Sequence, residues 1–240
     1  MNFNLFYLIV IGHFIEAIKN EELHLYLSII ATTTMILVII NSFYEDYSFL
    51  DNLRHSFFAI VSLMTTSGFF TVDFSKWAMS TAVVFTFVMF VGGMAGSTGG
   101  GIKVARVGIL GKAAKSELKS IKNPRRVGGI SFNGKSMEEK QVIKIRNYFI
   151  VYMICVIVIF FLVSLENHID YRTAFSATMT TFNNIGAGYA TYEPGANFAD
   201  YTYFSKILLS FAMIAGRLEI YALFLFMPST YSLRSEEHTS

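Results

Sequence analysis

The sequence predicts an all-α integral membrane protein built from two repeats, each consisting of a span, a short re-entrant helix and a second span. Composition is the first observation. Of the 240 residues, 53% are hydrophobic and 15% are charged, and the mean hydropathy is +0.49. A soluble domain carries about 25% charged residues, and one soluble core cannot bury this much apolar surface, so lipid is the expected solvent. The other two observations are the spacing of the apolar segments and an internal repeat.

Four apolar stretches are each about long enough to cross a bilayer as a helix. They are Leu23–Phe43, Trp77–Ala95, Asn147–Leu165 and Thr202–Met227. Two segments between them, Leu53–Met64 and Arg172–Phe182, are too short to span. Because backbone at membrane depth must bond to itself or line a wet cavity, we predict a re-entrant half-helix for both short segments.

The charged residues predict which side of the membrane each loop faces. The segment Lys103–Arg146 contains 12 of the 19 Lys and Arg residues and three acids, whereas the segments around the two short helices are acidic. The positive-inside rule therefore places Lys103–Arg146 in the cytoplasm and the re-entrant segments on the outer side. Two interpretations of this basic loop stay open: a solvated connector, or the docking site of a regulatory subunit.

An internal repeat becomes visible when the chain is shifted against itself by 118 residues. Arg54 then falls on Arg172 and Gly68 on Gly186, and the first span overlies the third. Membrane repeats usually share a site at the axis that relates them. Parallel repeats with re-entrant loops favour a pore over a rocking carrier.

Both short helices end in polar residues followed by glycine. The first ends in Thr65–Phe69 and the second in Asn183–Gly188. Glycine permits backbone angles that turn successive carbonyls to one side, and a ring of such carbonyls can replace the water shell of a cation, as in potassium channels. The candidate filter residues are Thr66, Ser67, Gly68, Phe69, Asn184, Ile185, Gly186 and Ala187. The alternative interpretation is an ordinary helix C-cap glycine in each repeat.

A glycine-rich segment follows the second span. Six of the ten residues from Gly92 to Gly101 are glycine, and each glycine costs about 1 kcal/mol in a helix relative to alanine. We therefore predict a loop that breaks the helix at membrane depth. A phosphate-binding loop is excluded because Ile102 separates Gly101 from Lys103 and Val104 follows.

Arg217 and Glu219 lie within the fourth apolar stretch. Charge inside a membrane is costly and indicates a functional site. Arg217 could face the conduction path and set a barrier to cations, or it could pair with Glu219 and lock two helices together. Lys103 could be an anchor at the inner membrane surface or could lie near a gate.

Taken together, these motifs resemble the membrane subunit of Trk/Ktr/HKT potassium transporters. The resemblance rests on Thr65–Phe69, Gly92–Lys103, Asn183–Gly188 and Gly216–Ile220. It implies a pseudo-fourfold cation pore of four repeats, of which this chain holds the third and fourth. Potassium is the implied transported ion, sodium is the alternative, and no covalently bound cofactor is expected.

The resemblance also implies roles for particular residues. Gly68 and Gly186 would be filter glycines, Arg217 would be the arginine below the filter, and Ala187 departs from the proline usual in the family. The gating loop would comprise Gly92, Gly93, Gly96, Gly99, Gly100 and Gly101. The implied location is the bacterial inner membrane. The implied partners are membrane lipid, a second copy of the chain, and a cytoplasmic nucleotide-binding regulatory subunit. No nucleic-acid partner is expected.

Five segments follow from this interpretation. They are the tail of a preceding repeat with a connector (1–22), a repeat with its glycine-rich loop (23–110), a basic connector (111–144), a second repeat (145–231) and a non-native tail (232–240). Met1–Asn4 resembles the end of the family's second repeat, and Arg234–Ser240 resembles a translated sequencing adapter. We expect such a half to be inactive alone, because it cannot close a filter of four parts.

Two other function classes were considered. A membrane enzyme would need a clustered nucleophile, an acid pair or a metal-binding set, and the sequence shows none, so we expect no enzyme. A fused pair of two-span channel units would share the filter logic but would predict neither Arg217 nor the long glycine-rich loop.

Overall fold

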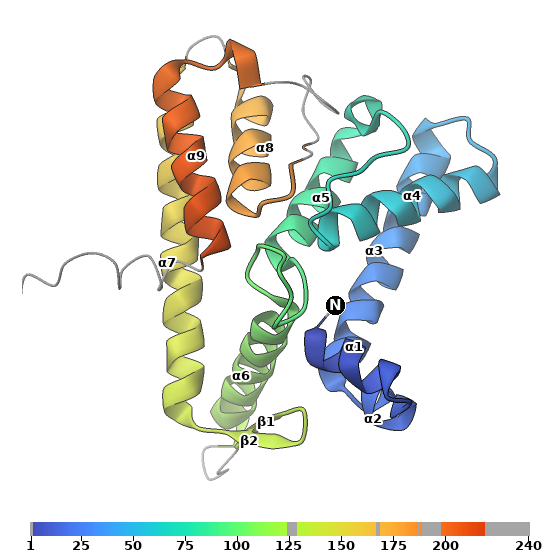
Figure 1. The fold of residues 1–240 in the computed structure, drawn as a ribbon, viewed down its shortest axis with the longest axis vertical. Helices are drawn as coiled ribbons and strands as arrows, with labels where there is room; N and C mark the ends of the chain where they lie inside the picture. Colours follow the sequence, from blue (N-terminus) through green and yellow to red (C-terminus); the bar gives the residue numbers. More distant parts are fainter. Residues whose placement is uncertain (1, 124–128, 167–168, 187, 189–197, 219–240) are drawn as a thin grey trace, which may run out of the picture.

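The computed structural model describes residues 2–123, 129–166, 169–186, 188 and 198–218 (Figure 1). The elements in chain order are α1 (Phe3–Val10), α2 (Phe14–Ile18), α3 (Glu21–Tyr44), α4 (Phe49–Met64), a 3-10 turn (Phe74–Lys76), α5 (Met79–Val91), α6 (Val104–Lys122), β1 (Ile130–Phe132), β2 (Lys135–Met137), α7 (Glu139–Val163), α8 (Tyr171–Phe182), a 3-10 turn (Phe198–Asp200) and α9 (Tyr203–Arg217). The order of long helix, short helix and further helix therefore occurs in α3–α4–α5 and again in α7–α8–α9.

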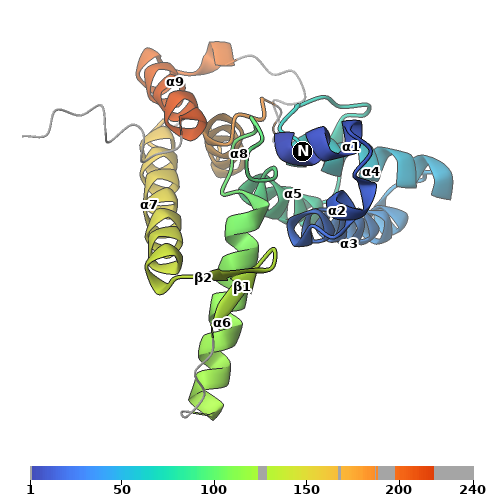
Figure 2. The same ribbon diagram turned by 60° about the horizontal axis from the view of Figure 1, so that its bottom comes forward.

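The two repeats pack against each other. Helices α4 and α5 pack on α3, helices α8 and α9 pack on α7, and α5 contacts α8 across the boundary. In Figure 1 the short helices α4 and α8 lie in the upper half, while α6 and the two strands lie at the bottom. Figure 2 shows α6 projecting away from the other helices.

Helices α3 and α7 have the dimensions and the surface of membrane spans. They contain 24 and 25 residues, which at 1.5 Å per residue is about 36 to 38 Å, against a hydrocarbon core of about 30 Å. Only 33% and 22% of their most apolar windows are buried. Ile39 on α3 and Ile157 on α7 are more than half exposed. A core helix of a soluble protein would bury such residues, so these faces suit lipid.

Both long helices begin at N-terminal capping residues. The Asn20 side chain accepts a hydrogen bond from the Leu23 amide at 3.0 Å, as an N-cap does. At the start of α7, the Glu138 amide donates to Oε1 of Gln141 at 3.1 Å, half of a capping box. The spans predicted from Leu23 and from Asn147 are thus confirmed, although α7 starts eight residues earlier, at Glu139.

The second predicted span is shorter than expected. The prediction ran from Trp77 to Ala95, but α5 covers Met79–Val91, 13 residues, or about 20 Å. Gly92 ends the helix with a φ of +68°. Trp77 lies outside the helix and packs its buried ring against Phe74 and Phe85. The fourth predicted span is described as far as Leu218, and α9 ends at Arg217.

The basic connector is more ordered than its composition suggested. It contains α6 and an antiparallel hairpin in which Ile130 pairs with Met137 and Phe132 with Lys135. Asn133 and Gly134 form the turn with φ values of +51° and +74°, as a two-residue hairpin turn requires. Among the described residues, these strands are the exception to the all-α prediction.

Candidate ion pathway

The end of α4 is a Schellman motif. The Ser67 amide donates to the Ser62 carbonyl at 3.0 Å, and the Thr66 amide donates to the Leu63 carbonyl at 3.2 Å. Thr66 has a φ of +57°, an unusual backbone angle for a residue other than glycine. The helix therefore stops abruptly, and the chain beyond it leaves in a defined direction.

The end of α8 repeats this geometry 118 residues later. The Ile185 amide donates to the Thr180 carbonyl at 2.9 Å, and the Asn184 amide donates to the Thr181 carbonyl at 3.0 Å. Asn184 has a φ of +55°. The internal repeat, which few sequence identities supported, is thus present in the hydrogen bonding of equivalent backbone atoms.

Each predicted filter glycine comes three residues after the C-cap residue of its helix. Gly68 and Gly186 have φ values of +71° and +88°. Neither glycine caps its helix, because Thr66 and Asn184 take the left-handed position directly after the C-cap residues Thr65 and Asn183. A Cβ at Gly186 would meet no heavy atom within 4 Å. Backbone conformation, not lack of space, therefore favours glycine there. Ala187 lies outside the described residues.

Side chains form hydrogen bonds to both predicted filter segments or to the helix ends just before them. In the first segment, the Ser62 hydroxyl donates to the Phe69 carbonyl at 2.5 Å. In the second, the buried Tyr152 hydroxyl donates to Oδ1 of Asn183 at 2.5 Å. The side-chain Nδ2 of Asn184 donates to the Met213 carbonyl at 3.1 Å. Sequence reasoning missed Tyr152, since nothing in the apolar run around it distinguishes this tyrosine from a core residue.

The glycine loop, defined here as Gly92–Gly101, lies directly against both filter segments. A Cβ on Gly99 would come within 2.9 Å of Oγ1 of Thr66, and a Cβ on Gly100 would overlap the carbonyl oxygen of Asn183. The loop thus contacts the ends of α4 and α8 together. The structure brings the predicted filter and the predicted gate into contact.

The neck of the glycine loop is closed by backbone hydrogen bonds. The amides of three consecutive residues donate to carbonyls on the opposite side of the neck: Ile102 to Phe90 at 3.1 Å, Lys103 to Val91 at 3.0 Å, and Val104 to Gly93 at 3.0 Å. A Cβ on Gly92 would lie 2.5 Å from the Gly100 oxygen. Gly96, with a φ of +73°, lies at the far side of the loop near Asn2.

Lys103 is not placed as a surface anchor. Its side chain is buried, and its ammonium donates to the Ser97 carbonyl at 3.0 Å and also to the Gly99 carbonyl. An anchor at the membrane surface would direct its charge to headgroups and water. Of the two predicted positions, the structure favours the one near the gate.

Arg217 is the last residue of α9, and its guanidinium donates to the Thr98 carbonyl. The neighbouring Gly216 allows α9 to approach the end of α8, because a Cβ there would overlap the Phe182 carbonyl oxygen. Glu219 lies outside the described residues. The sequence analysis did not identify Thr98 as the partner of Arg217, from which it is separated by 119 residues.

Comparison with known proteins places this arrangement in a family. The family model for TrkH, described as a cation transport protein, matches residues 6–233. The chain belongs to the TrkH family of cation transport proteins. The predicted family is thereby confirmed, and the chain is a multi-pass membrane protein.

Relatives in this family are named as Trk system potassium uptake proteins. The chain is 30% identical to TrkH of Salmonella typhimurium over 89% of its own length and 44% of the relative's. It is 35% identical to TrkH of Vibrio parahaemolyticus over 75% of its own length and 37% of the relative's. These relatives are transport proteins, in agreement with the expectation that the chain is not an enzyme.

A solved structure extends the comparison to the fold. The crystal structure of the potassium transporter TrkH from Vibrio parahaemolyticus superposes with a TM-score of 0.85 at 30% identity, covering 96% of this chain and 50% of that one. The chain therefore spans about half the length of the TrkH relatives that it matches, and its two repeats correspond to part of that crystal structure.

Proposed function

We propose that this chain supplies two of the four filter segments of a potassium uptake pore. One observation carries the proposal: two short helices end in the same Schellman geometry, 118 residues apart, above one shared glycine loop. Each helix directs its negative C-terminal end toward the filter, which attracts a cation. The proposal agrees with the potassium uptake named for the relatives.

The proposed selectivity comes from backbone oxygens. In the first segment, Thr66 and Gly68 have a left-handed φ and the residue between them does not. In the second segment, Asn184 and Gly186 show the same alternation. Backbone that alternates in this way can present successive carbonyls to one side, and such carbonyls can replace the water around a potassium ion. Hydrogen bonds from Ser62 to the Phe69 carbonyl and from Tyr152 to the Asn183 side chain hold the two segments in place.

The proposed gate is the glycine loop with its two cationic side chains. Lys103 and Arg217 each donate to carbonyls of the loop, so positive charge lies immediately below the filter. A cation that has passed the filter meets repulsion there until the loop moves. Arg217 and the long glycine-rich loop disfavour the two-span channel alternative, which predicts neither.

Two partners are also proposed. A second copy of the chain would form a homodimer, and a cytoplasmic nucleotide-binding subunit would regulate the gate. The hairpin, α6 and the start of α7 surround a cavity of about 870 Å³ whose lining includes Leu110, Met137 and Val142. Because α6 begins directly after the glycine loop, a protein bound at α6 could move the gate.

The test is selectivity in the complete transporter that carries this half. Gly68→Ser and Gly186→Ser should each raise sodium influx relative to rubidium influx, at least about threefold, because serine disfavours the left-handed angles that both glycines adopt. Gly111→Ser is the control, since a Cβ there meets nothing within 4 Å. Unchanged selectivity in both filter variants would refute the filter assignment. Sodium influx in the unaltered protein would favour the sodium-permeable alternative.

A further inference from the structure

Glu22 is an acidic residue buried beside the glycine loop. It occupies the first turn of α3 and has 2% of its surface exposed, whereas its neighbour Glu21 keeps 39% of its side chain exposed. A carboxylate is buried in proteins only where donors replace the water it loses. The donors to Glu22 therefore show what this side chain holds.

One donor comes from the glycine loop itself. The Ala95 amide, within the loop, donates to Oε1 of Glu22 at 2.5 Å. Ala105, just beyond the loop in the first turn of α6, and the Asn2 side chain also lie near the carboxylate. One side chain thus fastens the loop to α3, close to the start of α6.

The carboxylate also places negative charge near the start of α6. The residue in the N-cap position of α6 is Lys103, which has a φ of +80° and makes no side-chain capping bond. Negative charge is favourable at the start of a helix, and Glu22 supplies it from another helix. Because Glu22 binds the loop and lies beside the start of α6, it couples the shape of the loop to the position of α6.

We propose that Glu22 is the positioning residue that keeps the glycine loop against the filter, and that the β1–β2 hairpin sets the position of Glu22. This inference rests on the proposed function, in which the loop is the gate. Glu22 acts through the loop and touches no transported ion. Loss of its bond to Ala95 frees the loop backbone and removes the negative charge beside the start of α6.

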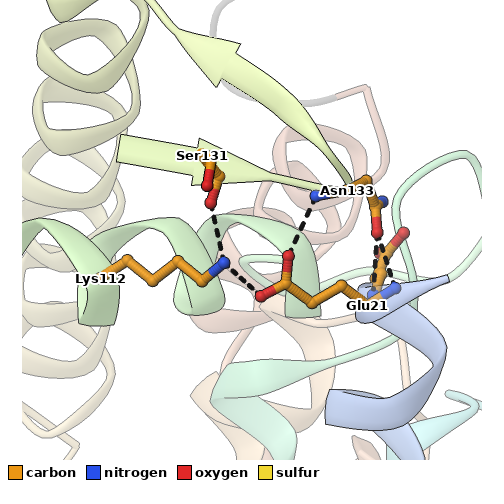
Figure 3. A network of polar contacts seen from close by, with 5 residues as sticks. Glu21, Lys112, Ser131 and Asn133 are labelled. Atoms are coloured by element: carbon orange, nitrogen blue, oxygen red, sulfur yellow. Dashed lines mark hydrogen bonds and ion pairs between the residues drawn. The ribbon is translucent and has the colours of Figure 1, made fainter. Parts of the chain in front are cut away.

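The hairpin binds the start of α3 through the Asn133 side chain, and Lys112 joins the same network (Figure 3). Oδ1 of Asn133 accepts hydrogen bonds from the amides of Glu21 at 2.7 Å and Glu22 at 3.3 Å. The Glu21 carboxylate accepts from the Asn133 amide at 3.0 Å and pairs with Lys112 of α6. Lys112 donates in turn to the Ser131 carbonyl at 2.7 Å. Movement of the hairpin tip is therefore passed to the residue that holds the loop.

The experiment measures loop accessibility in the complete transporter. In a Cys155→Ala background, Met94→Cys places a thiol in the loop at a position that is fully buried, so that its modification requires the loop to move. A membrane-impermeant maleimide then reports how often the loop moves. Glu22→Gln should raise the rate of modification about tenfold and raise rubidium influx at unchanged selectivity. Glu22→Asp, which keeps the charge, should restore much of the slow rate.

Controls separate positioning from simple loss of folding. Glu16→Gln removes an exposed carboxylate from α2 and should leave the rate as it was. Asn133→Gly keeps the positive φ of the hairpin turn but removes the bonds to Glu21 and Glu22, and should raise the rate in the same direction. A rate in Glu22→Gln equal to that in Glu16→Gln would overturn the proposal, and so would a lower influx with an unchanged rate. The rate of thiol modification is measured without ion flux. If the proposed potassium function is wrong, the influx measurements will fail while the modification rates still test the role of Glu22.

Discussion

Two cationic side chains bind consecutive carbonyls of the glycine loop. Lys103 donates to those of Ser97 and Gly99, and Arg217 donates to that of Thr98. Carbonyls that point toward a fixed cation are poor ligands for a passing one, because the two positive charges would repel each other. In the proposed pore, the filter and the loop are both rich in backbone oxygen, yet they would offer a cation opposite electrostatic environments.

The first prediction concerns Arg217. Arg217→Ala should raise cation influx through the complete transporter, because it removes one positive charge from the path and one bond that holds the loop. This influx is measured as rubidium uptake into cells that lack other potassium uptake systems. Lys206→Ala on the same helix is the matched control, since Lys206 donates to the Ala199 carbonyl near the other end of α9. Equal uptake in the two variants would assign Arg217 a purely structural role.

Residue-scale contacts were only partly predictable from the sequence. The positions of Gly68, Gly186 and Arg217 follow from local rules for glycine and for intramembrane charge. Tyr152 and Glu22 do not, because their functional partners are 31 and 73 residues away. A tyrosine in an apolar run and a glutamate in a helix first turn have ordinary local explanations, and only tertiary structure reveals their other bonds.

At the scale of elements, the loop and the end of α8 fit together because one residue has no side chain. Gly100 meets the backbone of Asn183 so closely that a Cβ would overlap its carbonyl oxygen. Neither partner is a flexible side chain that could move aside. The contact therefore requires glycine for lack of space, unlike the filter position Gly186.

The second prediction tests this fit. Gly100→Ala should lower the free energy of unfolding by about 1–3 kcal/mol, the usual cost of overpacking, and should displace the loop from α8. Gly111→Ala provides the comparison: it lies within α6, where a Cβ meets nothing within 4 Å, and alanine there should stabilise the helix by about 1 kcal/mol. Thermal unfolding of the purified complete transporter in detergent measures both. A Gly100→Ala protein as stable as the Gly111→Ala protein would contradict the close contact.

The elements themselves were predicted unevenly. The two short helices and the break after α5 were predicted, because length limits and glycine content decide them. The hairpin was missed, although Asn133-Gly134 is a strong local turn signal, because the high charge of this segment led us to expect only a connector. The second span was drawn too long because its apolar run continues to Ala95, past the glycine at which the helix ends.

At the scale of the whole molecule, the long helices leave apolar faces uncovered. They expose side chains such as Ile39 and Ile157, which suits lipid or a neighbouring subunit. The two proposed filter segments lie at the ends of α4 and α8, against the glycine loop. Two segments can present carbonyls from two directions, whereas a cation stripped of water needs oxygen atoms on all sides.

The last prediction follows from this incomplete ring. The chain expressed alone should insert into the membrane but should not support rubidium uptake. Co-expression with a separate chain that carries the N-terminal half of the Salmonella typhimurium relative, of which this chain matches 44%, should restore uptake, because four segments can then surround the ion. The same pairing with Gly68→Ser should restore uptake with reduced selectivity, which shows that this half supplies part of the filter. Uptake by the chain alone would mean instead that copies of it assemble into a complete ring, and cross-linking would then reveal an oligomer.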